Sequence, residues 1–141
     1  MQPRFRNWVL ALSLCLTVVS SLGAGTRSVV VERARTRIGV ARVVLNMAPL
    51  TLTDVGLVGD YALSVPLAPF MGDTGTVEIP LTRSLSETLA PGMTLRGTAT
   101  SKEDGRIHDV ACTFEKSSKV RIVVTTPGRV LSFEAPYTLT N

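Results

Sequence analysis

The stretch that decides the fold is 94-TLRGTATSKEDGRIHDVACTFE-115, followed closely by 119-KVRIVVTTPGRVLSFEA-135. Each part contains two runs rich in β-branched and apolar residues, with a short turn sequence between them. Asp104-Gly105 is a pair typical of hairpin turns. Pro127-Gly128 fits a type II turn, whose third residue needs a positive φ. The segment therefore predicts two consecutive antiparallel hairpins.

Alternation along these runs predicts which side chains face the core. In the second hairpin, Val120, Ile122 and Val124 lie on one face, and Leu131 and Phe133 are their expected partners across the turn. Side chains of a strand alternate between its two faces, so this apolar set must face the interior of a sheet protein.

Further short β-type runs precede this segment, and they set the fold class. They lie at Ser28–Glu32, Arg37–Leu45, Asp60–Val65 and Thr76–Leu81. Pro80 makes the last of these an expected edge strand, because proline cannot donate to a ladder. One short connecting helix is expected near 84–90, where Ser84 and Glu87 resemble a capping box and Pro91-Gly92 ends the run. We expect an all-β protein with an antiparallel, immunoglobulin-like β-sandwich as the first choice and a small β-barrel as the second.

The first 24 residues are predicted to be a secretion signal peptide. Arg4 and Arg6 precede the apolar run Trp8–Val19, and small residues follow it. This order is typical of an export signal cleaved after Gly23 or Ala24. Residues 25–141 then form a single β domain that is exported, to the periplasm or outside the cell, with no transmembrane anchor after cleavage.

Cysteine content and charge restrict the class of protein further. Cys15 would leave with the signal, so Cys112 would be the only cysteine of the exported domain. The domain could not close an internal disulfide and would depend on its apolar core. Loss of Arg4 and Arg6 would also lower the net charge of +4 by two. Such mild basicity gives no reason to expect a nucleic-acid partner.

Few side chains of this sequence are suited to catalysis or metal binding. His108 is the only histidine, which excludes a copper or zinc site built on several imidazoles of one chain. On a strand, His108 and Cys112 share a face but lie roughly 13 Å apart, so they cannot share a proton or a metal. We expect Cys112 to be a buried small hydrophobe, and His108 to be hydrogen-bonded or solvated. No catalytic, metal-binding or cofactor-binding residue is assigned, and no cofactor is expected.

The one local charge feature is basic. If the chain is extended there, Arg33, Arg35 and Arg37 project from one face. These three arginines are the candidate contact for an anionic partner such as a glycan or a lipid surface. The alternative is a solvated strand edge, where charge prevents edge-to-edge pairing.

The sequence therefore predicts a non-catalytic exported β domain with a binding or structural role in the cell envelope or outside the cell. An envelope protein is a further possible partner. Two alternatives stay open: a strand-exchanging assembly subunit of the fibre type, and a carrier of a small apolar ligand inside the sandwich or barrel. An enzyme is the least favoured class, and a cleft that joins His108 to a carboxylate would raise it.

Overall fold

The computed structural model describes residues 27–141, apart from the side chains of residues 86 and 87. The expected signal peptide therefore lies outside the described residues, and export stays a prediction. Within the described part the chain is all-β, and its paired strands run antiparallel. The strands are β1 (Ser28–Val31), β2 (Ala34–Ile38), β3 (Ala41–Met47), β4 (Leu50–Leu52), β5 (Gly56–Ser64), β6 (Asp73–Pro80), β7 (Thr94–Ser101), β8 (Ile107–Phe114), β9 (Lys119–Thr126) and β10 (Arg129–Thr140). A 3-10 turn, η1 (Pro69–Met71), follows β5, and the short helix α1 (Leu85–Thr88) follows β6.

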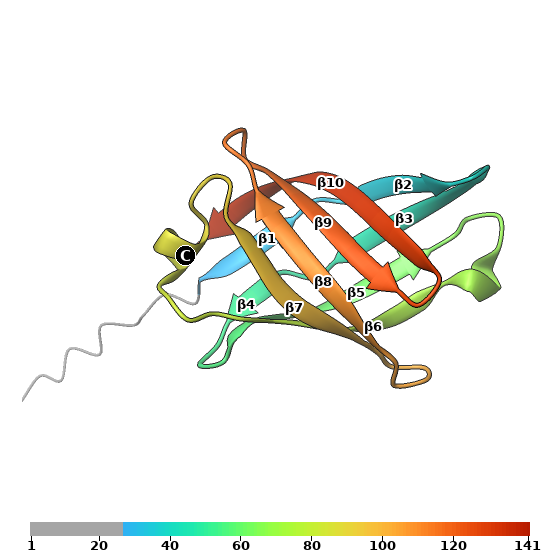
Figure 1. Ribbon diagram of the computed structural model, residues 1–141, viewed down its shortest axis with the longest axis horizontal. Helices are drawn as coiled ribbons and strands as arrows, with labels where there is room; N and C mark the ends of the chain where they lie inside the picture. The colour runs from blue at the N-terminus through green and yellow to red at the C-terminus, as the bar shows by residue number, and fades with distance from the viewer. Residues whose placement is uncertain (1–26) are drawn as a thin grey trace, which may run out of the picture.

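The sheet closes on itself as a barrel of eight strands. Hydrogen-bonded neighbours run in the order β5, β4, β1, β10, β9, β8, β7 and β6, and β6 pairs again with β5. The ring is completed by β1 and β10, where Ser28 lies opposite Thr140 and Val31 lies opposite Tyr137. The hairpin of β2 and β3 extends this wall beyond β1 and β4, and β3 also pairs with β5 (Figure 1).

The chain passes up and down the barrel, so its connections gather at two ends. We call one the loop end: it carries the connections β2–β3, β5–β6, β7–β8 and β9–β10 (Figure 1, right). The other, the terminal end, carries the start of β1, the C-terminus and the connections β4–β5, β6–β7 and β8–β9 (Figure 1, left). The immunoglobulin-like sandwich is not confirmed, because one sheet closes into a ring instead of two sheets packing face to face. The barrel, the second expectation, fits this topology.

The two C-terminal hairpins are confirmed, with one correction. Leu131 lies opposite Val124 and Phe133 opposite Ile122, as the alternation predicts. Gly105 has a φ of +69°, which the Asp-Gly turn uses. The type II turn at Pro127-Gly128 is wrong, because Gly128 is not among the glycines with positive φ.

Upstream, two strand predictions are wrong in detail. The run Arg37–Leu45 is not one strand, because a turn at Gly39, with a φ of +59°, separates β2 from β3. The strand with Pro80 is not an edge, because β6 pairs with both β5 and β7. Pro80 is tolerated since the β6–β7 register ends at Glu78 opposite Thr98, before the proline. The helix near 84–90 is confirmed as the single turn α1, and the Glu87 side chain of the expected capping box lies outside the described part.

Large side chains fill the barrel from its middle to the terminal end. The largest fully buried residues all lie there: Phe114, Phe133, Leu50, Leu57, Ile79, Val29 and Val120. An eight-stranded barrel is just wide enough for side chains to fill it, or to leave room for one small ligand. Here the aromatic and aliphatic residues close the terminal end and leave the loop end as the place for a cavity.

Phe133 should therefore be a main source of stability. We expect Phe133→Ala to lower the free energy of unfolding by about 3–5 kcal/mol, because it removes a fully buried ring from the closed core. Val130→Ala, on the same strand but 65 % exposed, should change it by less than about 0.5 kcal/mol. Equilibrium urea unfolding of both variants checks this, and equal small losses would contradict the closed core.

Candidate functional site

A cavity of about 170 Å³ lies inside the barrel, in the half nearer the loop end. Its walls come from β3, β5, β6, β7, β8 and β9. The lining is mostly aliphatic, with a few polar residues: Leu45, Met47, Leu63, Val77, Ala99, Val110, Ile122 and Val124 on the apolar side, and Tyr61, Asp73, His108 and Thr126 on the polar side. Such a mixture of apolar walls and few polar groups is typical of ligand pockets.

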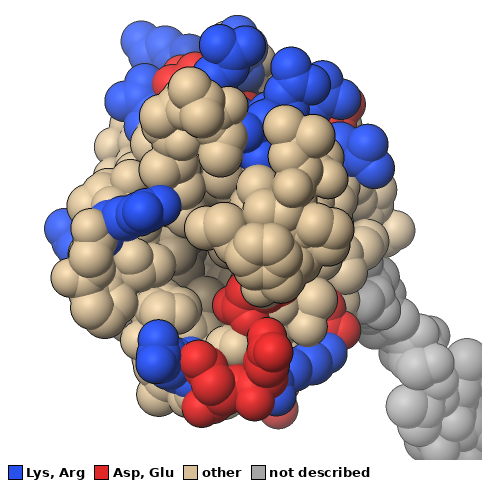
Figure 2. Space-filling view, turned by 90° about the vertical axis from the view of Figure 1, so that its right-hand side faces the viewer, with Lys and Arg blue, Asp and Glu red and all other residues tan. Residues whose placement is uncertain are grey.

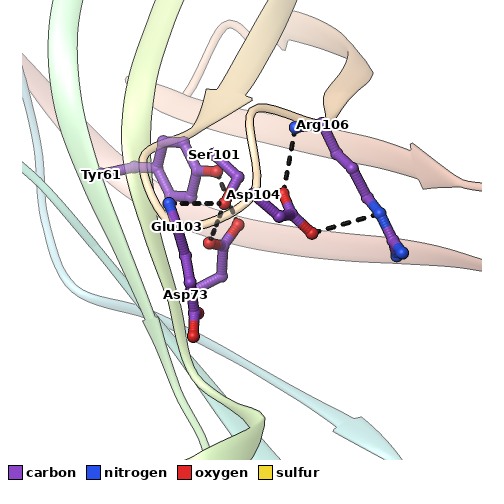
Figure 3. A network of polar contacts seen from close by, with 6 residues as sticks. All are labelled: Tyr61, Asp73, Ser101, Glu103, Asp104 and Arg106. Atoms are coloured by element: carbon purple, nitrogen blue, oxygen red, sulfur yellow. Dashed lines mark hydrogen bonds and ion pairs between the residues drawn. The ribbon is translucent and has the colours of Figure 1, made fainter.

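Asp73 is held from two neighbouring strands at the edge of this cavity (Figure 3). The Tyr61 hydroxyl donates to Asp73 Oδ2 over 2.7 Å. The Ser101 hydroxyl donates to Asp73 Oδ1 over 2.6 Å. Tyr61 and Ser101 are buried, with 6 % and 5 % of their surface exposed. Both carboxylate oxygens are thus fixed by neutral donors, and each retains a lone pair for a further donor.

Gly75 is what allows Tyr61 to reach Asp73. Tyr61 lies directly opposite Gly75 in the β5–β6 register. A Cβ at position 75 would lie 2.7 Å from Tyr61 Oη and 2.0 Å from the Thr100 carbonyl oxygen. Only glycine leaves room for both the phenol and the neighbouring backbone, which explains a glycine inside a strand.

The β7–β8 turn extends the same network towards the surface. The Glu103 N–H donates to Ser101 Oγ over 3.3 Å. The Arg106 N–H donates to Asp104 Oδ1 over 3.0 Å, and the two side chains form an ion pair of 3.1 Å. This backbone hydrogen bond is the main reason that the pKa of Asp104 is lowered. The turn is therefore fixed beside Asp73 (Figure 3).

His108, one of the residues that line the cavity, carries an unpaired polar atom. Its Nδ1 is buried and has no hydrogen-bond partner among the described residues. The expectation that His108 is hydrogen-bonded or solvated is wrong for this atom. A buried polar atom without a partner is costly in free energy, and native structures usually satisfy it. A molecule in the cavity is one way to supply that partner.

Cys112 shares the inward face of β8 with His108 and Val110, as the sequence predicts, but it does not line the cavity. It is free and only 2 % exposed. Burial raises the pKa of its thiol to about 12. At neutral pH the thiol is therefore protonated and packed, which confirms the expected role as a small hydrophobe.

The three arginines predicted to contact an anionic partner do not lie at the cavity. Arg33, Arg35 and Arg37 are exposed on β2 or immediately before it, and they alternate with the less exposed Ala34 and Thr36. The Arg33 Nε–H donates to Asn46 Oδ1 over 2.9 Å. The extended geometry of the ladder is thus present, but none of the three lines the cavity. Contact with an anionic partner remains a prediction.

Sequence reasoning missed Tyr61, Asp73 and Ser101 as site residues. They are distant in the chain, and only the register of β5, β6 and β7 joins them. The available signal was the glycine opposite Tyr61, which marks a close approach. The structure also places His108 and a carboxylate, Asp73, around one cavity. This is the arrangement expected from the sequence to raise the rank of an enzyme among the candidate functions, and catalysis itself stays a prediction.

Comparisons with protein-family models, with curated proteins and with solved structures found no match. Across residues 27–141, no helix is long and apolar enough to cross a membrane. In the same part of the chain, no three His, Cys, Asp or Glu side chains are grouped as a metal site.

The Tyr61–Asp73 contact predicts a pH dependence. Burial and the hydrogen bond to Asp73 raise the pKa of Tyr61 above its ordinary value near 10. The unfolded chain therefore loses this proton first, and the stability contribution is lost as pH rises above about 10. Urea unfolding between about pH 9 and about pH 11 should show a steeper fall for wild type than for Tyr61→Phe. Parallel curves would contradict the contact.

Proposed function

We propose that this protein binds one small, mostly apolar molecule inside its barrel. The single observation that carries the proposal is the cavity of about 170 Å³ whose lining includes His108, a residue with a buried and unpaired Nδ1. A core packed only for stability would fill such a volume with side chains, because interiors are close-packed. The proposal develops one alternative from the sequence, the carrier of a small apolar ligand.

The volume limits the size of the ligand. An engineered cavity of about 150 Å³ in another protein stays dry and binds benzene. The cavity here is of similar size, at about 170 Å³. It therefore suits a molecule of one ring with a small substituent, and it is too small for a fatty acid or a fused ring system.

The polar residues limit the chemistry of that substituent. Asp73 can accept a further hydrogen bond, and a neutral His108 can accept one at Nδ1. The apolar walls and the Asp73 carboxylate offer no partner to an anionic group, whose burial here is unfavourable. A ligand with one O–H or N–H group at the edge of an apolar ring satisfies both demands, so phenol is a suitable probe.

Filling the cavity should abolish binding. Ala99 lines the cavity and is 4 % exposed, so Ala99→Leu places three added carbons inside it. Ala111→Leu is the matched control, because Ala111 lies on the outer face of the adjacent strand β8. Titration of phenol and of benzene, followed by NMR shifts of the wall methyl groups, should show binding to wild type and Ala111→Leu but not to Ala99→Leu. Equal binding by all three would place the site elsewhere, and no binding to wild type would refute the proposal.

A second variant tests the polar end separately. His108→Leu removes Nδ1 but keeps an apolar wall. It should weaken the binding of phenol by about fivefold, the value of one net hydrogen bond, and leave the binding of benzene unchanged. An equal loss for both probes would show that His108 only shapes the cavity.

A second candidate function is acid–base catalysis on the bound molecule. The observation in its favour is that His108 and Asp73 line one cavity, and both residue types act as general acids or bases. A carrier releases its ligand unchanged, which mass spectrometry of the recovered molecule checks. A modified product that disappears in His108→Leu would favour catalysis.

We also propose that binding takes place outside the cytoplasm. The support is the pattern of residues 1–24, with its two arginines, apolar run and small residues. Mass spectrometry of the mature N-terminus, expected at Ala24 or Gly25, and fractionation of the producing cells would test it.

A further inference from the structure

The two ends of the barrel differ in their exposed apolar residues. Nine large hydrophobic side chains are exposed in the described chain, and six lie in or beside the loop-end connections: Val40, Leu67, Phe70, Met71, Ile107 and Val130. Three of them are almost wholly exposed, with 103 % for Val40, 92 % for Leu67 and 88 % for Phe70. Scattered exposed apolar residues are ordinary, but a group at one end marks an interaction site.

The β5–β6 connection presents its apolar residues from a fixed backbone. The Ala68 N–H donates to the Val65 carbonyl over 2.9 Å, and the Met71 N–H donates to the Ala68 carbonyl over the same distance. Pro69 restricts the backbone further at the start of η1. This folded turn therefore holds Leu67 and Phe70 in exposed positions.

Two arginines of the β2–β3 hairpin lie beside these exposed apolar residues. Arg37 and Arg42 lie directly opposite each other in the β2–β3 register. Among the described residues no carboxylate is within ion-pair distance of either guanidinium. A groove between the β2–β3 and β5–β6 connections is lined by Arg37, Val40, Arg42, Pro66 and Leu67. Like charges opposite each other repel, and an anion placed between them would relieve this repulsion.

Figure 2 shows the side of the molecule that is on the right in Figure 1, which is the loop end. Basic residues gather along its upper part, acidic residues gather along its lower part, and uncharged surface lies between them. Part of the acidic charge is already neutralised by ion pairs, because Lys102 pairs with Asp60 at 3.3 Å and Arg106 pairs with Asp104 at 3.1 Å. Among the described residues of the loop end, Arg37 and Arg42 on the β2–β3 side and Arg129 at the start of β10 are in no ion pair.

We propose that the loop end docks on an anionic lipid surface. Leu67, Phe70 and Val40 enter the boundary between head groups and acyl chains, while Arg37 and Arg42 contact lipid phosphates. A lipid surface offers both a dense layer of anionic groups and a hydrocarbon layer immediately below it. An anionic glycan offers the charge without the hydrocarbon. This inference goes beyond ligand binding in the barrel and does not depend on it.

The test is co-sedimentation of the protein, residues 25–141, with phosphatidylcholine vesicles that contain or lack phosphatidylglycerol. We expect binding to the anionic vesicles, weakening with added salt, and little binding to the neutral ones. Arg37→Ser/Arg42→Ser should weaken binding by roughly 25-fold, about fivefold for each arginine near an anionic surface. Leu67→Ser/Phe70→Ser should weaken it by at least about tenfold, because insertion is lost.

Matched controls come from the terminal end. Val55 is 67 % exposed, and Arg83 is exposed in the β6–β7 connection. Val55→Ser and Arg83→Ser should leave vesicle binding unchanged. Failure of wild type to bind anionic vesicles would overturn the proposal, and so would equal binding by all variants. Retention on heparin without vesicle binding would also overturn it and would indicate a glycan partner. All four variants change exposed residues, and circular dichroism checks that they stay folded.

Discussion

The pairing of β1 with β10 is the constraint on which the rest of the structure depends. These are the first and last described strands, and their four-residue register from Ser28–Thr140 to Val31–Tyr137 turns an open sheet into a ring. β10 serves both sides of the junction, because residues 129–136 pair with β9 and residues 137–140 pair with β1. Closure pairs both sides of the strands in the ring, while β2 keeps one side without a strand partner because it pairs with β3 alone.

Closure also fixes the width of the interior, and side-chain size then decides what the interior does. Phe114 and Phe133 are almost completely buried and occupy the middle and the terminal end. Towards the loop end the inward positions hold smaller or polar residues, among them Ala99, Val110 and Thr126. The size of the inward side chains therefore decides where an eight-stranded barrel is filled and where it leaves a cavity. One added side chain of moderate size can therefore remove it without affecting the barrel.

Short-range features were predictable from sequence, and long-range pairing was not. The hairpin at Asp104-Gly105 and the shared face of Val110 and Cys112 follow from local turn chemistry and period-two alternation. The barrel could not be told from a sandwich, because no local signal records that Val31 meets Tyr137 across the chain. For the same reason the contact between Tyr61 and Asp73 was missed, since it depends on the register of β5 against β6. The turn at Gly39 did leave a local signal, the glycine itself.

The cavity lies next to the apolar loop end, but hydrogen bonds at Asp73 oppose the transmission of a loop movement to the cavity wall. Leu63 and Asp73 lie at the two ends of the β5–β6 connection, and both line the cavity. A displacement of the connection would therefore reach the cavity through Asp73. Its carboxylate is held by Tyr61 from β5 and by Ser101 from β7, so both strands that flank β6 resist such a displacement. Contact at Phe70 can thus occur without a change in the cavity wall, and the two surfaces can be altered one at a time.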